Sequence, residues 1–359
     1  MKSLLLCSLP LLGGLLFGSL SSTAQPLTDK EPHINPSADS TNKPLAFSFA
    51  AIGDAPYDKG DERLLRDVID DMDNQTLAFV VHVGDIKSGS EPCSDTLLET
   101  RKELLNSSNH ALILVPGDNE WTDCHRKAAG SYDPIERLNR LRELFYDDEW
   151  SLGKNRITLV RQSDVARFHS YRENVRWEQG NILFVGINLP GSNNNYLLEA
   201  GRNGEFEERL IANHWWLSRA FSIAKQKHLA GVVVIAQGNP LFENSLFSIH
   251  KDASVSRSKL RASAARDGYA EFKELLADLS VDYAQHSNGK VLFIHGDTHH
   301  FQTDHPLKDS AGKALPYFTR LETFGAPFVN NWIRVTVDPT TETLFLIESH
   351  HVGESRQLP

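Results

Sequence analysis

Four segments of this 359-residue chain share one pattern, a run of apolar residues that ends in Gly-Asp. The four pairs are Gly53-Asp54, Gly84-Asp85, Gly117-Asp118 and Gly296-Asp297. Short apolar runs of this kind predict buried strands, and open α/β proteins place their sites at the carboxyl ends of parallel strands. A single Asp here would more often cap a turn, but several at one edge would repel one another unless a cation lies among them. The pattern therefore predicts an α/β fold with a carboxylate-rich edge that binds metal.

The spacing of apolar residues predicts strands and helices in alternation. Strands are expected at Phe47–Ile52, Phe79–Val83, Ala111–Val115, Ile182–Ile187, Val232–Ala236 and Val291–His295. Helices are expected from an N-cap at Asp61 to Asp71, and at Asp95–Leu105, Pro134–Phe145, Phe206–Lys227 and Tyr269–Ser280. Hairpins are expected within 157–188, and antiparallel strands at Tyr317–Leu321, Trp332–Val337 and Leu344–Glu348. The first βαβαβ run predicts a parallel sheet. All of the expected strands and helices together predict a large α/β structure with two sheets.

The N-terminus has the three parts of a secretory signal peptide. Lys2 precedes a Leu-rich apolar stretch that ends in the small residues Ser22-Thr23-Ala24, which predicts cleavage after Ala24. A membrane anchor is the alternative, and the glycines, the proline and the short span argue against it. We therefore expect a signal peptide over 1–24, a flexible leader over 25–44 and one domain over 45–352. The protein is expected to be exported, to the periplasm or the cell exterior.

The charge balance excludes some partners. Acidic residues outnumber basic ones 47 to 37, and the net charge is −10. Non-specific nucleic-acid binding and polybasic membrane contacts both need a positive surface, so neither is expected. The sequence leaves the oligomeric state open.

Two cysteines remain if the signal peptide is removed, Cys93 and Cys124. An oxidising compartment would favour one disulfide between them, with two free thiols as the alternative. Both residues follow Gly-Asp strand ends by a few positions, in loops that leave neighbouring strands. We predict that they are bonded and fasten the loops that frame the site.

The fourth Gly-Asp pair is followed by Thr298 and then by two histidines, His299 and His300, whose ring nitrogens could bind a metal. A lone His is more often structural, but histidines beside a carboxylate at a strand end are a plausible metal cluster.

With these motifs in place, the chain resembles the calcineurin-like metallophosphoesterase superfamily over most of residues 45–350. The superfamily has the motifs Asp-x-His, Gly-Asp, Gly-Asn-His-Asp/Glu, a His after a strand, and Gly-His-x-His, in this order. The counterparts here are Asp54-Ala55-Pro56, Gly84-Asp85, Gly117-Asp118-Asn119-Glu120, Gln237 and Gly296-Asp297-Thr298-His299. The resemblance implies two mixed β-sheets packed as a sandwich with flanking helices.

The resemblance also implies a ligand set, from which this chain departs. Pro56 stands where the superfamily has a His, and Asn119 where it has its catalytic His. The implied metal ligands are Asp54, Asp85, Asp118, Gln237, Asp297 and His299, with Asp85 bridging two divalent cations. Because these donors are mostly oxygens, Mn²⁺, Mg²⁺, Fe²⁺ or Ca²⁺ are expected rather than Zn²⁺.

The implied activity is hydrolysis of a phosphate mono- or diester of a small phosphorylated substrate by a metal-activated water. Asn119 can hydrogen-bond a phosphate but cannot act as an acid, so His300 is a candidate proton donor, with His125 and Glu120 as others. The alternative is a catalytically inactive module that binds metal or phosphate on the same fold, because the catalytic His is replaced.

Overall fold

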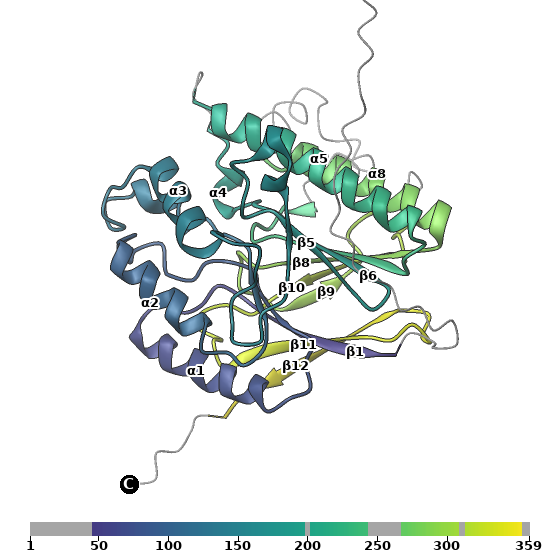
Figure 1. Ribbon diagram of the computed structural model, residues 1–359, viewed down its shortest axis with the longest axis horizontal. Coiled ribbons are helices and arrows are strands. Elements are labelled where there is room, and N and C mark those ends of the chain that lie inside the picture. The colour runs from purple at the N-terminus through teal and green to yellow at the C-terminus, as the bar shows by residue number, and fades with distance from the viewer. Residues whose placement is uncertain (1–44, 198–201, 243–266, 309–312, 354–359) are drawn as a thin grey trace, which may run out of the picture. The chain divides into compact units, whose positions relative to one another are not determined.

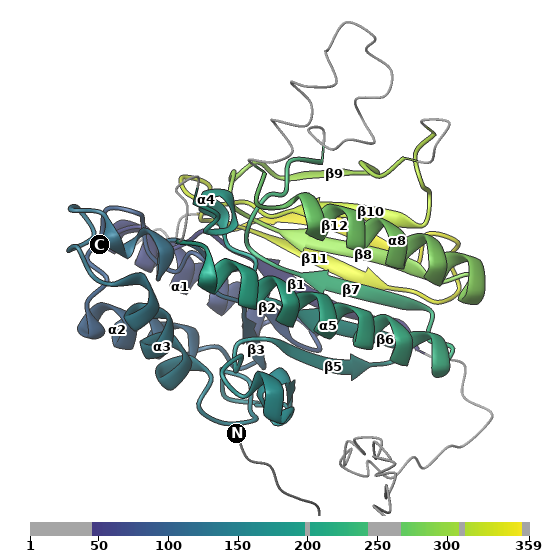
Figure 2. The same cartoon turned by 90° about the horizontal axis from the view of Figure 1, so that it is seen from above.

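The computed structural model describes residues 45–197, 202–242, 267–308 and 313–353. The predicted signal peptide and leader lie outside these ranges, and their bounds stay predictions. The two predicted sheets are present in the described ranges, with helices on the outer face of each (Figures 1 and 2). The predicted fold class is confirmed.

The first sheet is mixed and has five strands, in the order β12-β11-β1-β2-β3. Its strands are β1 Phe47–Ile52, β2 Val80–His82, β3 Leu112–Leu114, β11 Asn331–Val337 and β12 Phe345–His351. β1, β2 and β3 are parallel, as the βαβαβ pattern predicted, whereas β11 pairs antiparallel with both β1 and β12. The carboxyl ends of β1, β2 and β3 therefore meet at one edge.

The second sheet has seven strands, in the order β4-β5-β6-β7-β8-β10-β9. They are β4 Val160–Arg161, β5 Val175–Gln179, β6 Ile182–Gly186, β7 Gly231–Ile235, β8 Lys290–His295, β9 Gln302–Asp304 and β10 Phe318–Glu322. β4, β5 and β6 form the expected antiparallel hairpins, and β6, β7 and β8 run parallel. β10 was expected to be antiparallel, but it lies parallel to β8 and is antiparallel only to β9.

Three apolar layers hold the sheets and helices together. Side chains such as Phe49, Val81, Phe184 and Ile294 fill the space between the two sheets. The outer face of the five-stranded sheet packs on α1 Lys59–Asp73, α2 Asp95–Leu105 and α3 Pro134–Phe145. The outer face of the seven-stranded sheet packs on α5 Gly204–Gln226 and α8 Ala270–Ser287, which lie side by side (Figure 2). None of the described helices has the length and apolarity that a membrane span needs.

The start of α1 differs from the prediction. Asp58, not Asp61, is the N-cap, because its backbone is extended and its side chain accepts hydrogen bonds from the N–H groups of Gly60 and Asp61. Asp61 lies in the first turn, and its Oδ2 accepts a hydrogen bond from the N–H of Tyr57 at 3.0 Å. This bond fixes the short segment between β1 and α1, which carries Tyr57 to the site described next.

Candidate functional site

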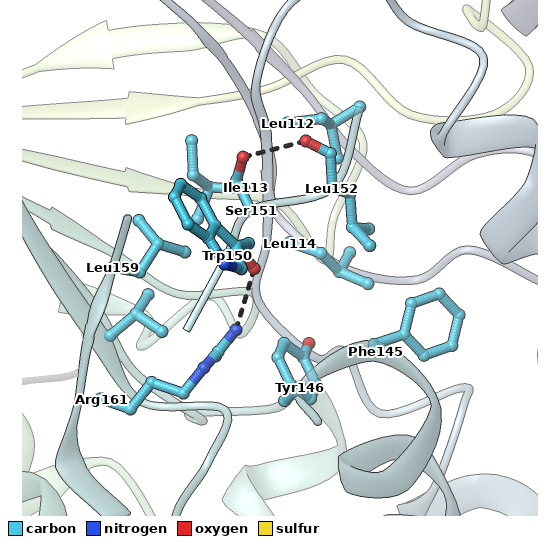
Figure 3. A pocket seen from close by; sticks show the side chains of 11 residues that line it. Leu112, Ile113, Leu114, Phe145, Tyr146, Trp150, Ser151, Leu152, Leu159 and Arg161 are labelled. Carbon is cyan, nitrogen blue, oxygen red and sulfur yellow. Dashed lines mark hydrogen bonds between the residues drawn. The ribbon is translucent and has the colours of Figure 1, made fainter. Parts of the chain in front are cut away.

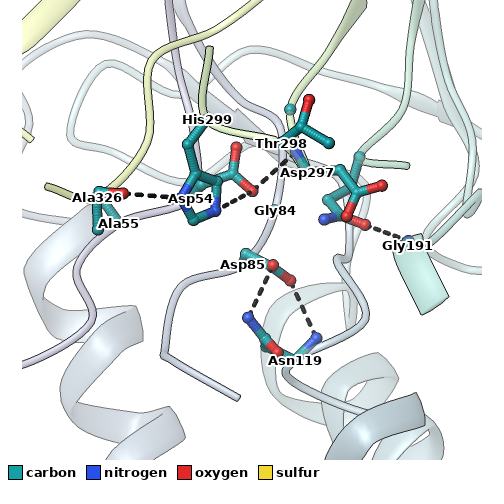
Figure 4. Close-up of polar contacts among 12 residues, drawn as sticks. Asp54, Ala55, Gly84, Asp85, Asn119, Gly191, Asp297, Thr298, His299 and Ala326 are labelled. Atoms are coloured by element: carbon teal, nitrogen blue, oxygen red, sulfur yellow. Dashed lines mark hydrogen bonds and ion pairs between the residues drawn. The ribbon is translucent and has the colours of Figure 1, made fainter. Parts of the chain in front are cut away.

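The six predicted metal ligands all follow strands whose carboxyl ends meet where the two sheets face each other. They are Asp54 after β1, Asp85 after β2, Asp118 after β3, Gln237 after β7, and Asp297 with His299 after β8. The N–H of Asp297 donates to Asp54 Oδ1 at 3.0 Å, which joins the two sheets directly (Figure 4). A Cβ on Gly191 would lie 2.6 Å from Asp297 Oδ1 and 2.8 Å from Asp118 Oδ1, so both carboxylates contact this glycine.

The backbone is unusual at most of these positions. Asp54, Asp85, Asp297 and His299 have φ values of 50°, 54°, 81° and 63°. The left-handed region is uncommon for residues other than Gly, although Asp and His adopt it more readily than most. Backbone conformations of this kind gather at functional sites, where the surrounding structure holds a side chain in a required direction. Their concentration at four predicted ligands supports a functional role for this edge.

Burial disfavours the ionised form of the clustered carboxylates and so raises their pKa values. Asp54 is fully buried, and burial raises its pKa well above the usual range, with further rises from the charges of Asp297 and Asp118. Burial also raises the pKa of Asp85 well above its usual range, and the charge of Asp118 adds to this. Burial and then the charge of Asp118 raise the pKa of Asp297 to about 7. The cluster is therefore costly to ionise in the absence of a compensating cation.

Glu120 and Lys87 support the two loops that carry Asp85 and Asp118. Glu120 Oε1 accepts hydrogen bonds from the N–H of Asp85 at 3.0 Å and of Gly117 at 2.8 Å. Lys87 is fully buried and its Nζ donates to the carbonyl oxygens of Ser88 and Asn119, both at 2.7 Å. Burial raises the pKa of Glu120 to about 7. Glu120, one of the candidate acids, thus holds the backbone of the predicted bridging ligand.

The ring of His299 is oriented for its Nε2 to act as a ligand. Its Nδ1 donates to the carbonyl oxygen of Ala326 at 2.8 Å, which leaves Nε2 without a proton in the neutral ring. Nε2 lies 3.8 Å from Asp54 Oδ1 (Figure 4) and 3.1 Å from the hydroxyl of Tyr57. The Tyr57 hydroxyl in turn donates to Asp85 Oδ2 at 3.2 Å. Tyr57 thus links two predicted ligands, and no residue spacing in the sequence singles it out.

Asn119 occupies both oxygens of Asp85. Its backbone N–H donates to Oδ1 at 3.0 Å and its Nδ2 donates to Oδ2 at 2.8 Å (Figure 4). The Cys93–Cys124 disulfide is present as predicted, with its two Cα atoms 5.7 Å apart, and both cysteines are fully buried. Both sulfur atoms lie close to the carbonyl oxygen of Asn119, at 3.5 and 3.6 Å. The disulfide therefore fastens the loop that carries Asn119 to the loop that follows Asp85.

Asp118 contacts a left-handed turn. The Ser192 hydroxyl lies 2.6 Å from Asp118 Oδ2 and 3.0 Å from Asp123 Oδ1. Ser192 belongs to α4 Gly191–Asn194, and four consecutive residues from Ser192 to Asn195 have φ between 49° and 56°. For most residues other than Gly this conformation costs about 1–2 kcal/mol per residue, and Asn, which fills three of the four positions, adopts it more readily. Side-chain contacts stabilise it: the guanidinium of Arg209 donates to both the backbone and the side-chain oxygen of Asn194.

Two predicted residues have other partners in the structure. Gln237 is fully buried, and its Oε1 accepts a hydrogen bond from the N–H of Gly191, while its amide lowers the pKa of Asp54. The His300 side chain is exposed, and its Nδ1 contacts the carbonyl oxygen of Thr298. Within the described ranges, His300 makes no hydrogen bond to any of the clustered carboxylates. The roles predicted for Gln237 and His300 stay predictions.

The donor chemistry fits a hard divalent cation. Asp54 Oδ2 is buried and, among the described residues, accepts no hydrogen bond of normal geometry. Such an oxygen, beside further carboxylates and a deprotonated Nε2, matches the oxygen-rich sets that bind Mg²⁺ or Mn²⁺. Over the same described residues, no three His, Cys, Asp or Glu side chains are arranged so as to hold a metal ion. Residue types and burial fit a cation, and Asp85 also accepts three hydrogen bonds from Asn119 and Tyr57.

A separate small pocket lies beside β3 and the end of α3 (Figure 3). It is lined mostly by apolar side chains, with Arg161 and Tyr146 at one side. It contains none of the predicted site residues, so it contributes nothing to the site at the strand ends.

Comparisons with known proteins give structural similarity without sequence similarity. No family profile matches the chain, and no curated protein matches it. Among solved structures, a dimetal phosphatase from Danio rerio is 16% identical, with a TM-score of 0.45 over 80% of this chain and 92% of that one. The Plasmodium protein GAP50, described as the anchor in the inner membrane complex, is 12% identical, with a TM-score of 0.44 over 88% and 91%.

The purple acid phosphatase PPD1 from yellow lupin is 11% identical, with a TM-score of 0.48 over 87% of this chain and 52% of the lupin chain. This chain therefore spans about half of the lupin enzyme. All three similarities lie at 16% identity or less and at TM-scores below 0.5.

Proposed function

We propose that this chain is an exported, metal-dependent phosphoesterase that hydrolyses a phosphate mono- or diester. The observation that carries the proposal is the convergence of Asp54, Asp85, Asp118 and Asp297 from four strand ends, with the unpartnered Asp54 Oδ2 among them. Buried carboxylates at one point repel each other unless a cation neutralises them. His299 adds a nitrogen donor beside Asp54.

The residues that would hold the cation are the six predicted from the sequence. A divalent cation would neutralise the carboxylates and act as a Lewis acid toward a phosphate oxygen. The chain's own residues orient the site: Ala326 fixes the tautomer of His299, and Glu120 fixes the backbone at Asp85. The Nδ2 of Asn119 is the amide donor nearest to Asp85, and it is suited to hydrogen-bond a phosphate oxygen. The buried disulfide supports export, because such bonds persist in oxidising compartments.

A catalytically inactive module that binds metal or phosphate is the second candidate. It is favoured by the bonds from Asn119 and Tyr57, which occupy both oxygens of Asp85. A cation that bound Asp85 through Oδ2 would compete with the Tyr57 hydroxyl and the Asn119 amide, whereas Oδ1 accepts only one hydrogen bond.

The test is one assay with two readouts. The purified protein is stripped of metal, and nitrophenol release from mono- and bis-nitrophenyl phosphate is followed with Mg²⁺, Mn²⁺, Ca²⁺, Fe²⁺ and Zn²⁺ in turn. Titration calorimetry with the same metals reports binding. Asp85→Ala should lose both binding and turnover, while Asp70→Asn, at an exposed position on α1, should lose neither.

Turnover that depends on metal and disappears in Asp85→Ala would establish the enzyme. Metal binding without turnover would favour the inactive module. Full metal binding by Asp85→Ala would refute the assignment of the site.

A further inference from the structure

Two histidines lie just before Gly-Asp pairs of the site, and neither is a predicted ligand. His82 ends β2, and Val83 separates it from the pair Gly84-Asp85, while His295 ends β8 and directly precedes Gly296-Asp297. Both side chains are fully buried, so neither can meet a substrate. Buried ring nitrogens are normally hydrogen-bonded, and their partners therefore indicate what each ring does.

The His82 ring joins the strand end that carries Asp85 to the strand end that carries Asp54. Its Nδ1 lies 3.2 Å from the backbone N of Gly84, and its Nε2 lies 2.9 Å from the carbonyl oxygen of Ala55. Because a backbone N–H can only donate, Nδ1 is the acceptor and carries no proton. Nε2 then carries the proton of the neutral ring and donates to Ala55. Burial lowers the pKa of His82 to about 4, so the ring is neutral at neutral pH.

Gly84 carries the other backbone contact between these two strand ends. Its N–H donates to the ring of His82, and its carbonyl oxygen accepts a hydrogen bond from the N–H of Asp54 at 3.0 Å. Its φ is 99°, and a Cβ there would lie 2.6 Å from the backbone N of Gly117, so a larger residue would not fit. His82 therefore holds the residue before Asp85 and the residue after Asp54.

The bond to Ala55 also fixes one end of the segment that carries Tyr57. This segment connects β1 to α1, and at its other end the N–H of Tyr57 donates to Asp61 Oδ2. The segment is thus held at both ends, by His82 and by Asp61. Its position matters to the site, because the Tyr57 hydroxyl contacts two predicted ligands.

His295 makes no comparable connection. Its Nδ1 lies 2.8 Å from the carbonyl oxygen of Gly296, the next residue in the chain, so Nδ1 donates and Nε2 carries no proton. Nε2 is buried and, within the described part of the chain, has no hydrogen-bond partner. His295 is therefore equally buried and also lies beside a Gly-Asp pair, but its ring bonds only within its own strand end. It is the matched control for His82.

We infer that His82 is a positioning residue for the cation site: its ring couples the strand ends of Asp54 and Asp85 and so sets the separation of these two predicted ligands. The inference rests on the proposed function, because it gives the ring a part in cation binding. Both ligands have left-handed backbone conformations, which persist only where surrounding contacts hold them. Binding groups must be held to within about 0.5 Å of the productive geometry, so loss of this coupling should weaken the site.

Three replacements of His82 separate the bond between the strand ends from the bond within one of them. His82→Gln places an amide N–H near the position of Nε2 and can keep the bond to Ala55. His82→Asn places its oxygen near the position of Nδ1, so it can accept from Gly84 but does not reach Ala55, and His82→Leu keeps neither bond.

Titration calorimetry with Mn²⁺ and Mg²⁺ measures the effect of each replacement. Metal affinity should be about 10- to 100-fold weaker in His82→Asn and His82→Leu, the range for groups that orient metal ligands. His82→Gln should stay close to the unaltered protein, and so should His295→Asn and His295→Leu. Urea unfolding of all five variants separates a loss of stability from a loss of metal affinity.

Two measurements on the metal-free protein do not depend on cation binding. NMR of the ring nitrogens should find the proton of His82 on Nε2. Hydrogen exchange at the N–H of Asp54, which bonds to Gly84, should be faster in His82→Asn and His82→Leu but not in His82→Gln or His295→Leu.

The positioning role would be overturned by unchanged metal affinity in His82→Asn and His82→Leu, by equal losses in His82→Gln and His82→Asn, or by a proton on Nδ1. If the unaltered protein binds no metal, the proposed function fails instead. Faster exchange at Asp54 in His82→Asn and His82→Leu alone would then still establish the coupling of the two strand ends, and unchanged exchange would refute it.

Discussion

Replacing Asp297 with Asn should stabilise the metal-free protein at alkaline pH. Burial and then the charge of Asp118 raise the pKa of Asp297 from 3.8 to about 7. The folded protein therefore holds this proton more tightly than the unfolded chain does, and ionised Asp297 destabilises the fold. Asn carries no charge and keeps an oxygen to accept the bond that the N–H of Asn239 donates to Asp297 Oδ2 at 2.9 Å.

The size of the effect follows from the two pKa values. Each tenfold difference in proton affinity corresponds to about 1.4 kcal/mol, so a rise from 3.8 to about 7 destabilises the folded state by about 4 kcal/mol at pH 8. Because the folded pKa is the higher one, this penalty grows as pH rises from about 4 to about 7 and is absent below that window. At pH 5 the difference between variant and unaltered protein should be about 2 kcal/mol.

Urea unfolding in EDTA at pH 8 and at pH 5 measures this difference. Asp70→Asn, an exposed Asp on α1, is the matched control and should change stability little at either pH. An Asp297→Asn protein that is no more stable than the unaltered one at pH 8, or whose gain does not shrink at pH 5, would refute the electrostatic reasoning about the whole cluster.

Three other perturbations test the frame around the site. Cys93→Ser with Cys124→Ser should cost about 3–4 kcal/mol in chemical denaturation, since the bond closes a loop of sequence separation 31, and an unchanged midpoint would contradict this. Burial lowers the pKa of His82 to about 4, so the folded protein loses stability relative to the unfolded chain as pH falls below about 6.5. Between pH 7 and pH 4 the free energy of unfolding of His82→Gln should therefore fall by about 3 kcal/mol less than that of the unaltered protein. Gly191→Ala places a Cβ 2.6 Å from Asp297 Oδ1 and should lower the free energy of unfolding by about 1–3 kcal/mol in the same assay. An unchanged free energy of unfolding would show that the turn moves to accommodate the Cβ without cost.

The strand-end pattern was enough to predict the architecture. A strand buried on both faces is continuously apolar, and the chain must turn at its end, so Gly-Asp after such a run marks both the strand and the edge. Two predictions were wrong, the direction of β10 and the first residue of α1, because the spacing of nearby residues does not determine either. β10 alternates like an antiparallel strand, but the neighbour with which it pairs, β8, is chosen by tertiary packing. Asp58 and Asp61 both precede the apolar face of α1, and only the backbone conformation at Asp58 makes it the cap.

The residues that sequence reasoning missed are single side chains without a spacing signal. Tyr57 and Ser192 contact the predicted ligands Asp85 and Asp118, and Asp123 accepts from Ser192, yet no residue spacing predicts these contacts. Ser192 reaches Asp118 across 74 positions of sequence, through a left-handed turn of one Ser and three Asn. Asn adopts this conformation more readily than most residues, but nothing in its position indicates which carboxylate the turn contacts. Such contacts depend on how the two sheets meet, and only the folded chain defines them.

Tyr57 and Asn119 also explain how an acidic cluster can exist before any cation binds. Their hydrogen bonds, together with the backbone N–H of Asn119, satisfy both oxygens of Asp85, the carboxylate predicted to bridge two metals. Asp54 has fewer donors: among the described residues, Oδ1 accepts the N–H of Asp297 and Oδ2 accepts no hydrogen bond of normal geometry. An entering cation therefore meets less competition at Asp54 Oδ2 and His299 Nε2 than at Asp85 Oδ2, which already accepts two hydrogen bonds.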